Sequence, residues 1–310
     1  MDAVTETTTI EGYEAIRLRS PSADFGATFV PRAGMLGASL RDAGVELLGQ
    51  RFGVRRYAED GKTMGIPLLH PWANRLAGDE YTIAGRAVRL EPGEPLVQRD
   101  KHGLPIHGLM GGARHWRARG DGASLRAELD YGAHPDLLAI FPFPHALELD
   151  VGVRDRTLTV RTTLTATGDV VVPVAFGYHP YLKLADVARA DWEVALPAMT
   201  HLELDARSIP TGASSPSPPW SGRLGERTFD DGFTDVEPGA SFAVAGDGRR
   251  ITVRLDEGFP AAQVFAPAND DVVCFEPMTA PANALLTGDL RLVPPGESYS
   301  AAFSITVDHA

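Results

Sequence analysis

The sequence predicts an all-β protein, and three observations lead to this prediction. Apolar and polar residues alternate with a period of two over many short stretches, as they do in half-buried strands. Gly, Pro and Asp pairs separate these stretches at short intervals, which is typical of antiparallel strands joined by turns. Long stretches of helical periodicity are scarce. We therefore expect antiparallel sheets with few short helices.

Seven stretches show the alternation most clearly, and each is expected to form a strand. Asp155-Arg156 lies between two of them and predicts a hairpin turn, and Gly246-Asp247-Gly248 before Arg249 predicts another. The seven stretches are residues 27–31, 81–90, 125–130, 146–154, 157–166, 250–255 and 301–307.

Two segments depart from this pattern. Residues 209–225 are rich in Pro, Ser and Gly, so we expect a long surface loop, with a loop at the rim of the functional site as the alternative. Phe141-Pro142-Phe143-Pro144 predicts an extended aromatic turn that packs into the core rather than a platform for a ligand.

Length and composition set the domain organisation. At 310 residues the chain exceeds the common single-domain size, yet β-sandwiches and barrels often reach this length, so one domain over residues 1–310 is expected. The composition, 44% hydrophobic and 23% charged, is that of a globular protein with a sizeable core.

Charge and cysteine content exclude several functional classes. The formal net charge of −12 disfavours nucleic acid and anionic membranes as partners and favours a small neutral or cationic ligand. Cys274 is the single cysteine, which excludes an internal disulfide and a cysteine-clustered zinc site. The N-terminal residues lack the features of a signal peptide, and no apolar run is long enough to span a membrane, so we expect a cytoplasmic protein.

The stretch of residues 172–184, VPVAFGYHPYLKL, carries the first candidate for chemistry. As a strand it would place Phe176 and Tyr178 on a bulky face, and Gly177 and His179 on a nearly bare one. Pro180, which has no N–H to donate, is expected to end the strand. We expect open space in front of His179 that a ligand can enter.

A second strand, over residues 271–277, carries Glu276 on one face with Val272 and Cys274. Partial burial there would raise the pKa of the carboxyl group toward the range of a general base, and the structural alternative is an ion pair with an arginine. We expect Glu276 and His179 to face each other across a cleft of the size of a sugar.

Other polar residues offer further candidates. His107, next to a glycine, is the second candidate histidine, whereas His70, His102 and His107 with a carboxylate form a weaker candidate zinc site that lacks any tight ligand spacing. Asn74 and Arg75 could bind vicinal hydroxyl groups, with a surface ion pair from Arg75 to an acidic neighbour as the alternative. Sequence patterns of serine-hydrolase, nucleotide and dinucleotide sites are absent.

Together these segments resemble the aldose 1-epimerase (galactose mutarotase) family. The resemblance implies a large antiparallel β-supersandwich with an open sugar cleft, and chemistry that needs neither metal nor cofactor. It covers nearly the whole chain in order, through GIPLLHPWANRLAG, IHG followed by Trp116, FPFPHALEL, GYHPYLKL, FDDGF, CFEPMTAPANAL and LRLVPPGESYS.

The resemblance also implies roles for the catalytic residues. Glu276 matches the general base that takes the proton of the anomeric hydroxyl, and His179 matches the general acid at the ring oxygen. His107 matches the second histidine of the site, which hydrogen-bonds the sugar. If His179 is protonated and Glu276 ionised at rest, their attraction should raise the pKa of His179 and lower that of Glu276.

For substrate binding, the resemblance points to Arg75, with Asn74 beside it, and to Asp230, with Asp231 left open as the alternative. The expected substrate is a small sugar, and the expected assembly is a monomer or homodimer. Lys183, Leu182 and Pro277-Met278 depart from residues common in the family, which leaves the preferred sugar undetermined.

Two alternative functions remain open at this point. A hexose-6-phosphate 1-epimerase would need a basic cluster at the far end of the sugar, for which Arg114, Arg117 and Lys183 are candidates, although the net charge disfavours it. A non-catalytic sugar-binding protein on the same scaffold would not need a matched acid and base.

Overall fold

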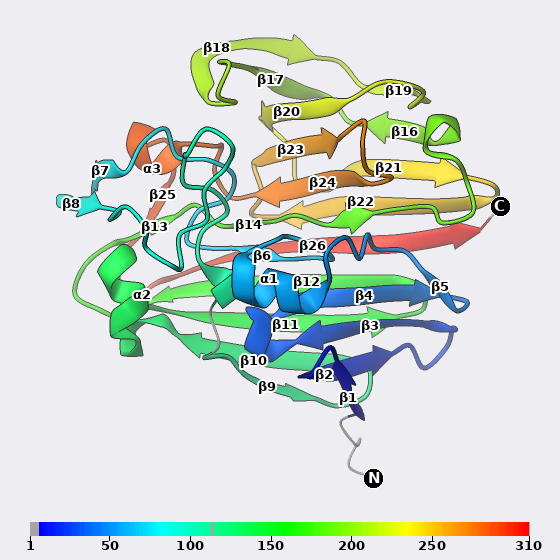
Figure 1. The fold of residues 1–310 in the computed structure, drawn as a ribbon, viewed down its shortest axis with the longest axis horizontal. Helices are drawn as coiled ribbons and strands as arrows, with labels where there is room; N and C mark the ends of the chain where they lie inside the picture. The colour runs from blue at the N-terminus through cyan, green and yellow to red at the C-terminus, as the bar shows by residue number, and fades with distance from the viewer. Residues whose placement is uncertain (1–5, 113–114, 310) are drawn as a thin grey trace.

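The computed structural model describes residues 6–112 and 115–309, which form mainly antiparallel β-strands, as predicted (Figure 1). The longest layer is a nine-stranded sheet. In spatial order it consists of β19 (Trp220–Arg223), β16 (Glu193–Leu196), β21 (Ala240–Gly246), β22 (Arg249–Glu257), β26 (Ser298–His309), β12 (Thr157–Ala166), β11 (His145–Arg154), β10 (Ser124–Asp130) and β9 (Arg117–Gly120).

An eight-stranded sheet and a five-stranded sheet face this layer. The eight-stranded sheet contains β18 (Pro210–Ser217), β17 (Met199–Leu204), β20 (Phe229–Thr234), β23 (Ala261–Ala266), β24 (Val273–Met278), β14 (Gly177–Tyr178) and β6 (Leu68–Leu69), and β15 (Tyr181–Leu182) also pairs with β24. The five-stranded sheet runs in chain order through β1 (Glu6–Ile10), β2 (Tyr13–Arg19), β3 (Phe25–Val30), β4 (Leu36–Asp42) and β5 (Val45–Glu46).

Smaller elements complete the described part of the chain. Two-stranded ladders join β13 (Val172–Val174) to β25 (Arg291–Val293) and β7 (Glu80–Ile83) to β8 (Arg86–Arg89). The α-helices are α1 (Gly53–Asp60), α2 (Pro135–Ile140) and α3 (Ala284–Thr287), and single 3₁₀ turns occur at Pro31–Ala33, Met110–Gly112, Tyr131–Ala133 and Arg189–Asp191. None of the described helices is long and apolar enough to cross a membrane.

Aromatic side chains fill the space between the nine-stranded and eight-stranded sheets. The rings of Phe242 on β21 and Phe275 on β24 lie 5.5 Å apart, and those of Tyr178 on β14 and Phe303 on β26 lie 4.9 Å apart. Residues next to them on β14 and β24 therefore point to the opposite face of the eight-stranded sheet, because side chains alternate along a strand. The bulky face predicted for Phe176 and Tyr178 is confirmed as the core face.

Several local predictions are confirmed and two are wrong. Both hairpin turns occur where expected, and Phe141 and Phe143 are fully buried. Residues 81–90 form the hairpin β7–β8 instead of one strand, because Ala84 and Gly85 both adopt positive φ and turn the chain. Residues 209–225 form β18 and β19 rather than a loop. Both are edge strands, where exposed Pro and Ser are tolerated without apolar alternation.

The predicted strand of residues 172–184 is divided into β13, β14 and β15. The space expected beside Gly177 is also filled. A Cβ atom on Gly177 would lie 2.7 Å from the carbonyl oxygen of Pro277 and 2.9 Å from Cβ of Ala73. This bare position therefore allows β14 to approach β24 and the loop that carries Ala73.

Replacing Gly177 with Ala should separate β14 from β24. We expect the variant to lose about 1–3 kcal/mol of unfolding free energy, as overpacked cores do. Urea denaturation measures this loss. Gly152→Ala is the matched control, because a Cβ atom on this strand glycine meets no neighbour within 4 Å. Equal stability of the two variants would contradict the close approach.

Candidate active site

His179 and Glu276 are in direct contact. Nε2 of His179 lies 3.1 Å from Oε1 of Glu276, and both residues are almost completely buried. The strand register causes this contact. Gly177 lies opposite Met278 and Tyr181 lies opposite Cys274, so His179 falls opposite Glu276. The expectation that the two residues face each other across an open cleft is therefore wrong.

Burial controls the protonation of this pair. It lowers the pKa of His179 well below 6.5, with further contributions from His107, Arg51 and Arg75. It raises the pKa of Glu276 well above 4.5, and the Asp230 carboxylate adds to this effect. Both directions are opposite to those expected from mutual attraction of charges, because removal from water penalises the charged forms more strongly. Burial therefore favours a pair that is neutral overall, in which the two residues together hold one proton.

His107 lies beside this pair on a loop that follows β8. Its ring meets the His179 ring edge-on, with centroids 5.3 Å apart. The residue has a positive φ of 63°, and its N–H donates to the carbonyl oxygen of Asn74 over 2.9 Å. The residue is partly exposed, but Nδ1 is buried without a protein partner. Burial of the ring, with a smaller contribution from Arg75, lowers the pKa of His107 to about 3.

Arg75 is held in place by its neighbours. Nε donates to Oδ2 of Asp100 over 2.8 Å, and Nη1 donates to Oδ1 of Asn74 over 3.2 Å. Nη2 lies 4.0 Å from Oδ2 of Asp230, which leaves this side of the guanidinium without a short bond. The alternative of a surface ion pair with Asp79 or Glu80 is wrong, since the partner is Asp100, whose side chain is mostly buried.

The two adjacent aspartates on β20 point to opposite faces of the sheet. Oδ1 of Asp230 accepts a hydrogen bond from Nε2 of Gln263 over 2.8 Å, on the face that carries Glu276. Oδ1 of Asp231 instead lies 3.1 Å from Nε2 of His201. The structure therefore brings Asp230, and not Asp231, toward Arg75 and Glu276.

Sequence reasoning missed three residues of this site: Asp100, Gln263 and Tyr181. Gln263 is the one polar residue in the buried strand β23, so polarity within an apolar stretch was an available signal. Asp100 accepts hydrogen bonds from the backbone N–H groups of His102 and Leu104, as an aspartate in a turn does. The residues around it in the sequence give no sign of its bond to Arg75. Tyr181 lies two residues after His179 where the chain runs alongside β24 in one register, so the two side chains share a face and the period of two was an available signal.

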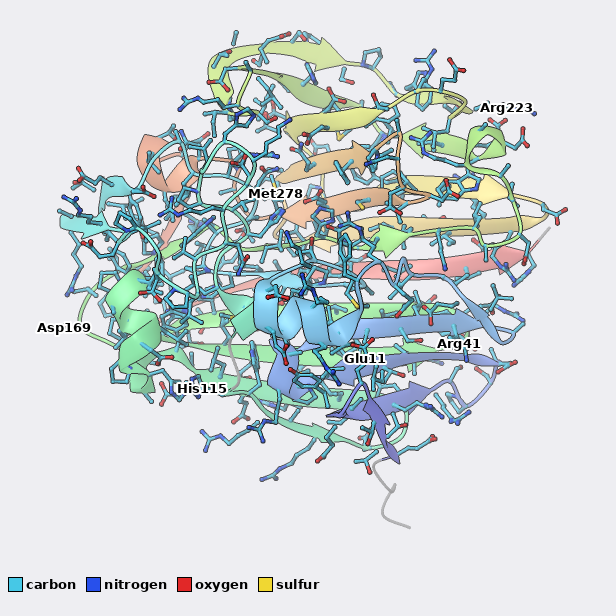
Figure 2. The ribbon with its side chains drawn as sticks, viewed as in Figure 1. Glu11, Arg41, His115, Asp169, Arg223 and Met278 are labelled. Atoms are coloured by element: carbon cyan, nitrogen blue, oxygen red, sulfur yellow. The ribbon has the colours of Figure 1, made fainter. Side chains whose placement is uncertain are left out.

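The candidate zinc ligands His70, His102 and His107 do not come together. His70 is buried, with Nε2 lying 2.8 Å from Nε2 of His145, and His102 is exposed. In the part of the chain that the structure describes, one group has ligand spacing, namely His115, His134 and Asp136. Figure 2 shows His115 beside α2, well apart from Met278 on the site-bearing strand β24.

A groove of about 510 Å³ lies over the five-stranded sheet, away from these residues. Polar residues such as Thr28, Ser39 and Gln50 line it, and none of the predicted site residues contributes. Arg114, Arg117 and Lys183 are the candidate basic residues for a phosphate group. Arg117 lies on β9 at the edge of the nine-stranded sheet, and Arg114 lies outside the described residues.

Comparison with known protein families agrees with this geometry. The family model of aldose 1-epimerase matches residues 37–306 of the chain. The chain belongs to this family. The match includes the loop of Asn74 and Arg75, His107, β14 and β24, so every candidate residue of the site lies within the family region of this aldose 1-epimerase homologue.

Relatives of this family member cover between 80% and 100% of its length. The uncharacterized protein YphB of Escherichia coli K12 is 26% identical over 271 residues, which are 80% of this chain and 87% of YphB. A galactose mutarotase-like protein from Clostridium acetobutylicum has a TM-score of 0.83 at 16% identity, over 100% of this chain and 99% of the other. A galactose 1-epimerase from Lactobacillus acidophilus has a TM-score of 0.75 at 14% identity, over 99% of this chain and 98% of the other. These structures establish the galactose mutarotase-like fold.

Neutral buried histidines predict that the protein loses stability on acidification. Burial holds the pKa of His107 at about 3 and that of His145 at about 4, and it also lowers those of His70 and His179. Below about pH 6.5 each histidine takes up a proton in the unfolded chain but not in the folded one, so the unfolding free energy falls. Glu276, with its raised pKa, acts in the opposite direction. Urea denaturation at pH 7 and pH 5 measures the difference.

The contribution of one histidine can be isolated with His107→Asn, because Asn tolerates the positive φ of this position. This variant should lose up to about 2 kcal/mol less than the wild type between pH 7 and pH 5. An unchanged pH dependence would show that His107 is not neutral in the folded protein.

Proposed function

We propose that this protein is an aldose 1-epimerase that interconverts the α and β anomers of a free aldose. One observation carries the proposal. Glu276 Oε2 and His107 Nδ1 are buried next to the His179–Glu276 contact, and neither has a hydrogen-bond partner among the described residues. Buried polar atoms are normally hydrogen-bonded, so a cluster of unpaired ones fits a polar ligand such as a sugar with its hydroxyl groups.

Anomer exchange needs a proton to leave O1 and another to reach the ring oxygen O5. These two oxygens are bonded to the same carbon, so the acid and the base that serve them must converge on one point. His179 and Glu276 converge in this way, with 3.1 Å between Nε2 and Oε1. After rotation about C1–C2, the same two groups act in reverse and close the ring. Each such group typically contributes about 10²–10⁴-fold in rate.

The neutral pair is suited to this reaction. Transfer of its one proton from Glu276 to His179 creates a base and an acid at once, without any change in the total charge of the buried site. Sugar hydroxyl groups that bond to the charged forms would favour this transfer, because they replace the solvation that burial removed.

Polar residues around the pair supply binding groups for the hydroxyls. Asp230 is the most accessible, since its side chain is 42% exposed, and Arg75 offers the guanidinium edge that faces it. Asn74 and Asp100 hold this guanidinium in position. We propose that Asp230 and Arg75 bind sugar hydroxyl groups and that His107 hydrogen-bonds the sugar through Nδ1.

The alternatives gain less support. A hexose 6-phosphate would need a cationic pocket, but Arg117 lies on β9 at the edge of the nine-stranded sheet, and the net charge is −12. A protein that only binds sugar has no need of a buried acid–base pair, whose burial costs stability. A free aldose bound by a monomer or homodimer is therefore the proposed substrate and assembly.

Glu276→Gln should lower the rate of anomer exchange by at least about 10²-fold, because the amide keeps the shape of the carboxyl group but cannot accept the O1 proton. Polarimetry of freshly dissolved α-D-glucose, α-D-galactose and a small set of pentoses measures the rate. Asp231→Asn is the matched control, because this carboxylate bonds to His201 on the other face of the sheet. A Glu276→Gln protein with near wild-type kcat would remove Glu276 from its proposed role.

The pH dependence of kcat/KM should be bell-shaped, and its two apparent pKa values should describe the coupled pair of His179 and Glu276 rather than either residue alone. Activity should fall in acid when the pair gains a second proton, and in alkali when it loses its one proton. His179→Asn should abolish activity, whereas His107→Asn should leave a weaker activity with the alkaline limb intact. An alkaline limb that disappears with His107 and survives without His179 would reverse the two roles.

A further inference from the structure

Besides Glu276, the side chain of Tyr181 is in direct contact with the imidazole of His179. The rings of Tyr181 and His179 are stacked, with centroids 4.2 Å apart and planes within 8°. The Tyr181 hydroxyl lies 3.3 Å from His179 Nε2 and 2.6 Å from Oγ1 of Thr63. The hydroxyl therefore contacts the same nitrogen that contacts Glu276.

This shared nitrogen creates a competition. An imidazole Nε2 either donates one hydrogen bond or accepts one, depending on whether it carries the proton. When it carries the proton, it donates to the Glu276 carboxylate, and the Tyr181 hydroxyl can donate to Thr63. When Nε2 has lost the proton, its one lone pair can accept either from a protonated Glu276 or from the Tyr181 hydroxyl. The hydroxyl can thus follow the protonation state of His179 without leaving its place.

We propose that Tyr181 is a positioning residue for His179: stacking fixes the plane of the imidazole, and the hydroxyl group donates to Nε2 whenever its proton has moved to the substrate. This inference rests on the proposed epimerase function and adds a residue to its acid–base machinery. Tyr181 acts through His179 and has no proposed contact with the sugar.

The surroundings of Tyr181 hold it rigidly for this task. The guanidinium of Arg51 lies 4.7 Å from the centre of the Tyr181 ring, on the outer side of the site. Arg51 is itself bonded to Asp270 over 2.8 Å and to the carbonyl oxygen of Thr63 over 3.2 Å. Arg51 therefore contacts both the Tyr181 ring and Thr63, the hydrogen-bond partner of the Tyr181 hydroxyl.

The inference gives a direction for pH effects. A donor to the unprotonated nitrogen stabilises neutral His179, so its removal should raise the pKa of His179 by up to about one. Removal of the Thr63 hydroxyl should leave the pKa of His179 unchanged or lower it, because the Tyr181 hydroxyl then has Nε2 of His179 as its remaining partner. The other groups that influence His179 remain in place in these variants: Glu276 on β24, His107 on its loop, Arg75, and Arg51 with its partner Asp270.

The test compares Tyr181→Phe with Tyr178→Phe in the full-length protein. Tyr178 is an equally buried tyrosine three residues earlier, and its hydroxyl lies 2.6 Å from Thr162 on the core side of the sheet. NMR of ¹⁵N-labelled imidazoles, with His179→Asn to assign the signal, reports the protonation of Nε2 and the pKa of His179. Thr63→Val provides the opposite perturbation.

We expect Tyr181→Phe to shift the His179 Nε2 signal and to raise the pKa, while Tyr178→Phe leaves both unchanged. The acidic limb of kcat/KM should move to higher pH in Tyr181→Phe by the same amount. Identical His179 titrations in the wild type and both variants would overturn the inference. The NMR result does not depend on turnover, so an absence of activity on every aldose would refute the proposed function and leave the assignment of Tyr181 to be decided separately.

Discussion

The contact between His179 and Glu276 is the interaction on which the rest of the site depends, and strand pairing creates it. Two ladder pairs in one register, Gly177 with Met278 and Tyr181 with Cys274, place the imidazole opposite the carboxyl group. A shift of one residue would turn one of the two side chains into the core. The bare Cα of Gly177 secures this register, because it allows the strands to approach closely.

Burial gives this contact its chemical character. The aromatic core beneath β14 and β24 excludes water from one side of the pair, and the loops of Arg75 and His107 cover another. The pair avoids the cost of two buried charges by sharing one proton as neutral groups. Asp230 and Arg75 are more exposed than the pair, so the proposed binding groups lie beside a buried histidine and carboxyl group.

The sequence predicted the architecture better than the electrostatics. Period-two alternation located most of the long strands, such as Thr157–Ala166, because these strands are buried on one face only. It could not divide residues 172–184 into three short strands or find β18, since interruptions and edge strands carry no alternation. Residue patterns singled out five of the site residues, and the resemblance to the family added Asp230 and the expected roles. The structure brings all six together, namely His179, Glu276, His107, Asn74, Arg75 and Asp230. The rise in the pKa of Glu276 expected from burial is confirmed, whereas the shifts expected from attraction between His179 and Glu276 were wrong, because a sequence does not reveal how completely a side chain leaves water.

The central claim is that this buried pair catalyses anomer exchange. Exchange NMR on an equilibrated aldose tests this claim most directly, because the α and β signals report the rate of interconversion without any coupled reaction. Our account predicts that, for at least one free aldose, the exchange rate increases in proportion to the concentration of the protein. Rates equal to the uncatalysed ones for every free hexose and pentose tested would contradict it.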